Sequence, residues 1–175
     1  MMPFHTIGHS DRSLDAFLAL LDEVDIGLVA DVRKLPGSRA HPQFDGPALA
    51  TALEGRGIGY EHFPDLGGRR SRVAGVDPSV NALWINPSFH NYADHALGKP
   101  FHAALSRLIA EGETRRCAVM CAEAVWWRCH RRIIADYLLS AGRTVIHILG
   151  PTRTEPARLT EGAVLRDGAV AYPAL

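Results

Sequence analysis

The sequence predicts an α/β protein: one domain with a mainly parallel central sheet, helices on both faces in three α/β/α layers, and a small C-terminal hairpin. Short apolar runs alternate with amphipathic runs of helical period, a pattern typical of right-handed βαβ crossovers. The 175 residues contain no internal repeat, low-complexity tract or linker. This length favours a single domain over residues 1–175.

Strands are predicted from five short apolar runs, at residues 4–7, 28–32, 58–63, 116–121 and 144–149. Ser13 is a plausible N-cap for a first helix, in which apolar residues recur at positions i, i+3, i+4 and i+7. Pro47 opens a second helix that runs to about Arg56, since proline is tolerated in the first turn.

The second half of the chain predicts two further helices, over residues 101–109 and 128–141. Residues 71–97 show no clear period, so we expect a long loop with short helical turns there. Asp167-Gly168 lies between β-type residues and predicts the hairpin turn.

Composition is that of a soluble globular protein, with 47% hydrophobic and 22% charged residues. No apolar run approaches the roughly 18 residues that span a bilayer, and no secretory signal is visible, so no membrane partner is expected. Three cysteines are an odd number without a disulfide-framework spacing, which favours a reducing cytoplasm. Oligomeric state is left open.

The net charge is zero, but the charges are unevenly distributed. Three proposed loops, residues 31–41, 65–72 and 121–132, hold nine of the 19 Lys and Arg residues and only three of the 19 Asp and Glu residues. If the fold brings these loops together, one face is basic, which suits a phosphate-bearing ligand such as DNA. The alternative is that these are solvated surface arginines.

The most informative segment is 121–132, which follows an apolar strand and precedes an amphipathic helix. Parallel sheets bind ligands at this kind of strand–helix junction. Glu123 lies in this segment and Asp31 ends the second strand, so the two carboxylates are candidate catalytic groups, with His130 as a third. Alternatively, each carboxylate pairs with Arg33 or Arg131 and only shapes the pocket.

The same loops supply further candidate binding residues. His9 and Ser10 follow Gly8 on the first strand-to-helix turn, although a core or capping histidine is the alternative. Trp126 and Trp127 suit stacking on a base, or else one indole covers the sheet. The remaining candidates for substrate binding are Arg33, Ser38, Arg69, Arg70, Cys121, Arg128, Cys129 and Arg131.

Cys121 and Cys129 admit two interpretations. Their spacing of eight does not match a zinc site, so no metal is expected. Cys129, near a helix N-terminus beside His130, has the better environment for a reactive thiol of lowered pKa. Otherwise both are small buried side chains. Gly67-Gly68 followed by arginines suggests an anion nest, but no nucleotide-cofactor motif is present and no cofactor is expected.

Four fragments together resemble the domain-of-unknown-function 488 (DUF488) family: Thr6–Ser10, Asp31-Val32-Arg33 with Pro36 and Ser38, Tyr60–Gly68, and Cys121-x-Glu123 with Cys129-His130-Arg131. The spacer 124–128 is more aromatic than is typical of that family. The resemblance implies excision of altered purines from DNA by a glycosylase. It implies Asp31 and Glu123 as acids, in a pocket lined by Arg33, Ser38, Cys121, Cys129, His130 and Arg131.

Two other function classes stay open. One is a cysteine-dependent or redox enzyme acting on a small phosphorylated substrate. The other is a non-catalytic module that binds nucleic acid or a nucleotide.

Overall fold

The computed structural model describes all 175 residues and shows a mixed α/β fold built on one six-stranded sheet. The strand order is β3-β2-β4-β1-β5-β6. Five strands are parallel: β1 (Phe4–Gly8), β2 (Leu28–Asp31), β3 (Gly59–His62), β4 (Cys117–Cys121) and β5 (Val145–Gly150). The predicted fold class and all five predicted strands are therefore confirmed.

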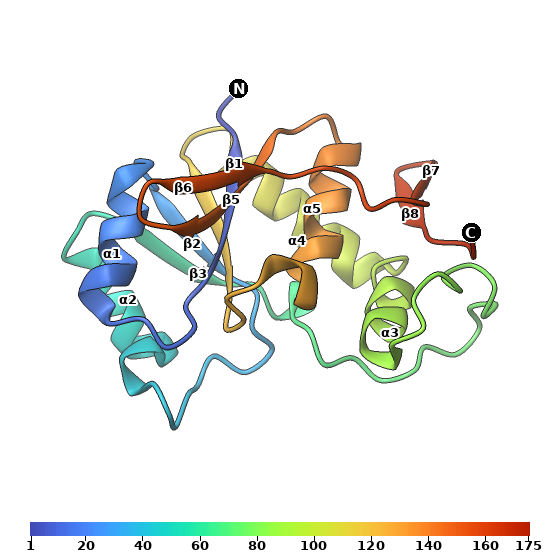
Figure 1. Cartoon of the computed structure of the whole chain (residues 1–175), viewed down its shortest axis with the longest axis horizontal. Helices are drawn as coiled ribbons and strands as arrows, with labels where there is room; N and C mark the ends of the chain where they lie inside the picture. The colour runs from blue at the N-terminus through green and yellow to red at the C-terminus, as the bar shows by residue number, and fades with distance from the viewer.

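Helices cover both faces of the sheet, as predicted (Figure 1). On one face, α1 (Leu14–Glu23) and α2 (Gly46–Glu54) bury their leucines against Ile7, Val29 and Met120. On the other face, α4 (Lys99–Glu111) and α5 (Arg131–Ser140) pack on Ala30 and Val119. Successive strand residues alternate between these two cores because strand side chains point to opposite faces. Ser13 caps α1 by accepting from the N–H of Ala16 at 3.1 Å.

Residues 71–97 are more regular than the sequence predicts. α3 (Pro87–His95) forms within this segment, begun by Asn86, whose side chain accepts from the N–H of Ser88 at 2.8 Å. The expectation of a loop with only short turns is wrong there, because the helix is short and its burial depends on distant partners. For example, Tyr92 of α3 is buried, and its hydroxyl donates to the carbonyl of Leu66, 26 residues earlier, at 2.7 Å.

The sheet also has an edge strand that the sequence did not indicate. β6 (Arg153–Pro156) pairs antiparallel with β5, and all four of its residues are exposed. Three single-turn 3₁₀ helices, η1 (Pro42–Phe44), η2 (Pro64–Leu66) and η3 (Trp126–Arg128), lie in the loops that follow β2, β3 and β4. None of the helices is long and apolar enough to cross a membrane.

The predicted hairpin forms between β7 (Val164–Arg166) and β8 (Ala169–Ala171), with positive φ at both turn residues, Asp167 and Gly168. The buried Tyr172 follows directly. Its carbonyl accepts from Leu83 N–H at 2.9 Å and its hydroxyl donates to Asp136 at 2.8 Å. The end of the chain therefore ties the segment before α3 to α5.

Candidate functional site

A cavity of about 850 Å³ opens at the carboxyl ends of the parallel strands. It lies beside β1 and β4, which are neighbours in the sheet. The chain leaves β1 for α1 on one face and leaves β4 for α5 on the opposite face, so the two loops diverge. Such a divergence is where open α/β sheets place their ligand sites. The three basic loops contribute to one cavity, as the sequence suggested they might if brought together.

Ten of the fifteen candidate residues line this cavity: His9, Ser10, Arg33, Ser38, Arg69, Cys121, Glu123, Arg128, Cys129 and His130. The other five do not line it: Asp31, Arg70, Trp126, Trp127 and Arg131. The lining residues that the sequence did not single out include Asp11, Leu35, His41, Phe89 and Tyr92. No three His, Cys, Asp or Glu side chains are arranged to hold a metal ion.

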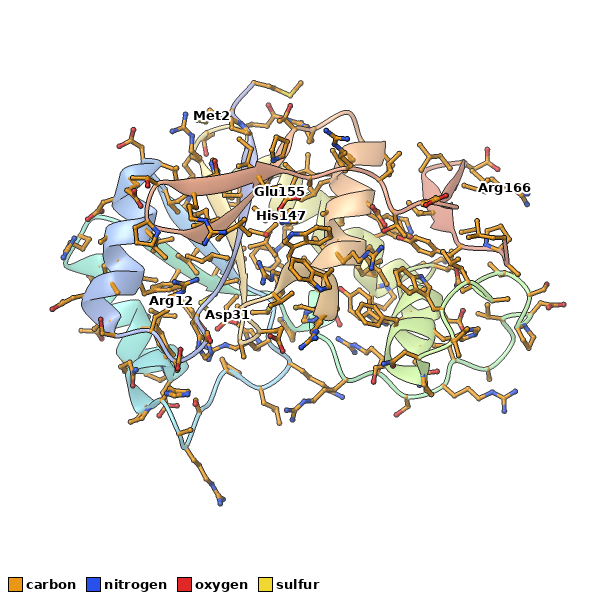
Figure 2. The ribbon with its side chains drawn as sticks, in the orientation of Figure 1. Met2, Arg12, Asp31, His147, Glu155 and Arg166 are labelled. Atoms are coloured by element: carbon orange, nitrogen blue, oxygen red, sulfur yellow. The ribbon has the colours of Figure 1, made fainter.

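Asp31 is fully buried and pairs with Arg33. The guanidinium binds both carboxylate oxygens, with Nε–Oδ1 at 2.9 Å and a terminal nitrogen to Oδ2 at 2.7 Å. The backbone N–H of Arg33 and the hydroxyl of Tyr60 also donate to this carboxylate, at 3.0 and 2.6 Å. Figure 2 shows Asp31 at the lower ends of the strands. The carboxylate therefore holds Arg33 in the cavity wall and presents no free oxygen to a ligand.

Arg33 in turn contacts His9. A terminal nitrogen of Arg33 lies 3.4 Å from Nε2 of His9, whose Nδ1 lies 2.8 Å from the carbonyl of Ser10. These contacts fix Nδ1 as the protonated nitrogen and Nε2 as the acceptor. The ring stacks on Phe44 at 4.4 Å. Burial, followed by the charge of Arg33, lowers the pKa of His9, so the imidazole is neutral near pH 7.

Glu123 is one of two exposed carboxylates in the cavity lining, the other being Asp11. One of its side-chain oxygens accepts from Val125 N–H at 3.4 Å, and its backbone carbonyl accepts from the Arg131 guanidinium at 2.7 Å. The same carbonyl lies so close to Gly8, at the end of β1, that a Cβ at Gly8 would collide with it. Gly8 therefore permits the close approach that sets the position of Glu123.

Cys121 and Cys129 lie in contact, with their sulfur atoms 2.6 Å apart. Burial, and then the hydrogen bond to Cys129, raises the pKa of Cys121 well above its usual range. Burial alone would also raise the pKa of Cys129. The hydrogen bond with Cys121 and the charge of Arg131 outweigh it and lower that pKa to about 7. Cys129 is thus the more acidic thiol, as its place before α5 predicted.

Arg131 lies beneath the cavity and is 1% exposed. Its side chain donates to Cys121 Sγ at 3.0 Å, to the Thr6 hydroxyl at 3.0 Å, and to the carbonyls of Glu123 and Ala124 at 2.7 and 3.3 Å. No carboxylate lies within ion-pair distance of this guanidinium. It therefore orders the loop after β4 and does not reach the ligand space.

His130 faces the thiols. Its Nε2 lies 2.7 Å from the carbonyl of Val32, which makes Nε2 the donor, and its Nδ1 lies 3.5 Å from Cys129 Sγ. Burial lowers the pKa of His130. A Cβ at Gly68 would approach Nδ1 to 2.9 Å, so glycine leaves room for this ring. Gly67 similarly leaves room for Lys34, and the glycine pair serves close packing between loops.

The two tryptophans have different surroundings. Trp126 stacks on the buried His147 at 4.4 Å with the rings nearly parallel, so this indole covers the sheet, which was the alternative to base stacking. Trp127 is 48% exposed, edge-on to Trp126 and outside the cavity. The aromatic residues that do line the cavity are Phe89 and Tyr92 on α3. Asn86-Pro87, a typical cap and first turn, was the sequence signal for that helix.

Charge in the cavity lining is mainly positive. Lys34, Arg69 and Arg128 are exposed there, against the carboxylates of Asp11 and Glu123. Arg70 has a different position, because its guanidinium donates to the carbonyls of Gly67 and Pro64 within its own loop. The mouth of the cavity therefore favours an anionic ligand.

Residues 13–138 match the family model described as "Domain of unknown function DUF488". No curated protein and no solved structure matches the chain.

Proposed function

Because the chain belongs to the DUF488 family, a domain of unknown function, we propose an activity from its cavity: hydrolysis of the N-glycosidic bond of a modified purine in DNA. The observation that carries this proposal is the placement of Glu123. It is an exposed carboxylate in the lining of a cavity of about 850 Å³, a volume within the range of small-ligand sites, beside three exposed cations.

The chemistry needs a negative charge near the sugar and a donor near the departing base. As the bond between the base nitrogen and C1′ breaks, its electron pair goes to the base and the sugar becomes cationic. The Glu123 carboxylate supports that charge or orients the attacking water. Arg33 is the donor that stays protonated, because its pairing with Asp31 outweighs burial and raises its pKa. In this proposal Asp31 acts through Arg33.

The histidines have a different part in this scheme. Burial lowers the pKa values of His9 and His130, so both rings are neutral near pH 7 and accept hydrogen bonds at the nitrogens described above. Since Nε2 of His9 already contacts Arg33 and Nδ1 of His130 already contacts Cys129, we assign both rings to shaping the uncharged part of the wall that faces the base. Phe89 and Tyr92 supply the aromatic wall for a base turned out of the duplex.

Two features of the mouth support DNA as the partner. Lys34, Arg69 and Arg128 are exposed and suit contact with flanking phosphates. Leu35, 73% exposed on the cavity lining next to Lys34, suits insertion between base pairs while the target base is extruded. The proposal also includes a reducing compartment, the cytoplasm, in which the three cysteines stay as thiols.

The test of the activity is base release from oligonucleotides that carry deaminated or amino-substituted purines, read as strand breaks after alkali. We expect Glu123→Gln to lose about 10²–10³-fold in turnover while it keeps DNA binding. Glu155→Gln is the matched control, since Glu155 is an exposed residue of β6, apart from Asp31 in Figure 2, and should act as wild type. If wild-type protein releases no base from any oligonucleotide, the proposed activity is wrong. An active Glu123→Gln variant would reject the residue assignment alone.

DNA binding has its own test. Fluorescence anisotropy with a labelled duplex should show affinity that falls steeply with salt, and Arg128→Ala should reduce the slope of log affinity against log salt by about 1. Arg166→Ala is the control, because Arg166 is exposed on β7 and apart from the cavity (Figure 2). Binding that does not respond to salt would contradict a nucleic-acid partner. Binding without turnover would favour the non-catalytic module.

A second candidate function is favoured by the Cys129 thiol, which lines the cavity and has its pKa lowered to about 7. In this alternative, the thiolate is the reactive group and the cations at the mouth hold the phosphate of a small substrate. Cys129→Ser separates the two functions, because it should abolish thiol chemistry and leave base release largely intact.

A further inference from the structure

Arg131 presents a problem of charge balance. Its side chain is 1% exposed, and a buried charge is costly unless it is paired. Among the atoms to which its guanidinium donates are two carbonyls and a hydroxyl, none of which carries a full negative charge. The remaining acceptor is the sulfur of Cys121, itself in contact with Cys129. The cysteine pair is therefore the only source of counter-charge among these contacts.

The surroundings of the pair favour one thiolate. Cys129 Sγ accepts from the backbone N–H of Arg131 at 3.4 Å, at the start of α5. Nδ1 of His130 lies 3.5 Å from the same sulfur and is unprotonated, so it is a proton acceptor beside the pair and not a donor to the thiolate. With the pKa of Cys129 lowered to about 7 and that of Cys121 raised, the negative charge resides on Cys129 and the proton on Cys121. Both cysteines belong to the cavity lining, and Cys129, 6% exposed, is the more accessible of the two.

From this geometry we infer that Cys121 and Cys129 form a reversible oxidation site, which a peroxide converts into an intramolecular disulfide. This inference does not rest on the proposed glycosylase activity. It rests on two thiols in contact, a buried cation that favours the thiolate, and an imidazole placed to take a proton.

The reaction balances in two steps. The Cys129 thiolate attacks one oxygen of hydrogen peroxide; the S–O bond forms, the O–O bond breaks, and hydroxide leaves and takes up a proton as water. Cys121 then loses its proton and its sulfur attacks Cys129 Sγ. The S–S bond forms, the S–O bond breaks, and the second hydroxide takes that proton as water. The two thiols lose two electrons in total, and the peroxide gains them.

Oxidation has a consequence for the cavity. A disulfide carries no charge, so Arg131 loses its counter-charge while it remains bound to the carbonyls of Glu123 and Ala124. The loop after β4, which carries Glu123 into the cavity lining, is therefore coupled to the state of the two sulfurs.

Cys117 provides the internal control. It begins β4, four residues before Cys121, and burial raises its pKa to about 12. It is therefore expected to stay reduced while the other two thiols react.

The experiment treats the reduced full chain with hydrogen peroxide at pH 7.5 and counts free thiols after denaturation. We expect wild type and Cys117→Ser each to lose two thiols, with recovery after dithiothreitol. Trypsin cleaves after Arg128, between the two cysteines, so the disulfide should join peptides 117–128 and 129–131. In Cys117→Ser this crosslink can only involve Cys121. We expect Cys121→Ser to stop at a sulfenic acid on Cys129, trapped by dimedone, and Cys129→Ser to react at least about tenfold more slowly.

Three outcomes would overturn the inference: all thiols remaining free in folded wild type, a crosslink lost in Cys117→Ser, or conversion of Cys129 to sulfinic acid without a disulfide. The first two use proteins with both thiols intact, so they decide the question even if Cys129→Ser fails to fold.

Discussion

Two buried arginines occupy neighbouring parts of the molecule and are balanced in different ways. Arg33 follows β2 and is 6% exposed; Asp31 holds it through two hydrogen bonds of 2.9 and 2.7 Å. Arg131 begins α5 and is 1% exposed, but it has carbonyls, a hydroxyl and a sulfur as its partners. The first cation has a permanent carboxylate, whereas the charge opposite the second depends on proton and redox state.

The difference indicates which part of the cavity wall is fixed. The Arg33 guanidinium binds both oxygens of the Asp31 carboxylate, so the wall that contains Arg33 is expected to be rigid. The cysteine pair titrates near neutral pH, so the wall built on Arg131 is expected to respond to its surroundings. Three predictions test this contrast.

The largest effect is expected for Asp31→Asn. This change leaves a buried guanidinium without its counter-charge, and we expect a loss of about 3–5 kcal/mol in the free energy of unfolding. Asp22→Asn is the control, because Asp22 pairs with Arg56 at an exposed site and should cost at most about 1 kcal/mol. Urea unfolding at pH 7 measures both. Equal losses in the two variants would show that the Asp31–Arg33 pair does not hold the wall.

A smaller effect is expected for the pH dependence that Cys129 adds to stability. Its pKa is about 9 in the unfolded chain and lowered to about 7 in the folded chain. Between pH 7 and 9 the Cys129 thiol is protonated in the unfolded chain but ionised in the folded chain, so stability rises with pH. The stability that the thiolate adds is fully present above about pH 9 and is lost as the pH falls through about 7. This contribution to the free energy of unfolding is roughly 2–3 kcal/mol, because the pKa of Cys129 differs by about 2 between the unfolded and folded chains.

The measurement is the difference in unfolding free energy between wild type and Cys129→Ser at several pH values from 6 to 8.5, with reductant present. Burial moves the pKa values of the neighbouring groups away from that of Cys129: it lowers the pKa of His130 and raises those of Tyr92 and Cys121, while the two cysteines outweigh burial and raise the pKa of Arg131. Cys117→Ser should give a flat difference. A flat difference for Cys129→Ser as well would mean that Arg131 is not balanced by a thiolate.

The smallest effect is expected for Gly68→Ala. The added Cβ would lie 2.9 Å from Nδ1 of His130, so the ring must move away from the thiols, at a cost of about 1–3 kcal/mol. Gly150→Ala is the control, since nothing lies within 4 Å of its Cβ position. Thermal unfolding and the alkylation rate of Cys129 report on stability and on His130. An unchanged thermal stability and alkylation rate in Gly68→Ala would indicate that the His130 ring accommodates the added methyl group without moving.

The parts of the fold that are coded locally could be predicted from the sequence. Strands β1 to β5 are apolar runs of consecutive residues, and helix α5 shows apolar residues at helical spacing. The loops of the cavity could be predicted to converge, because parallel strands end at one edge. The acidity of Cys129 also followed from a local feature, its position before α5.

Features that depend on distant contacts were missed. α3 has few apolar positions, and Tyr92 is buried by loops far away in the sequence. β6 is exposed at all four positions and exists because its backbone pairs with β5. The sequence left Arg33 and Arg131 as equal partners for Asp31 or Glu123, since only the fold decides which guanidinium meets a carboxylate.

Tyr172 bears on the order in which parts of the chain can pack during translation. Its hydroxyl binds Asp136, 36 residues earlier, and its backbone binds the segment just before α3. At about 5–20 residues per second, the nascent chain waits roughly 2–7 seconds after Asp136 emerges before this tyrosine can join it. During that interval the buried Asp136 lacks its phenol partner. We therefore expect the wall of the cavity that carries Phe89 and Tyr92 to dock only after Tyr172 has emerged from the ribosome.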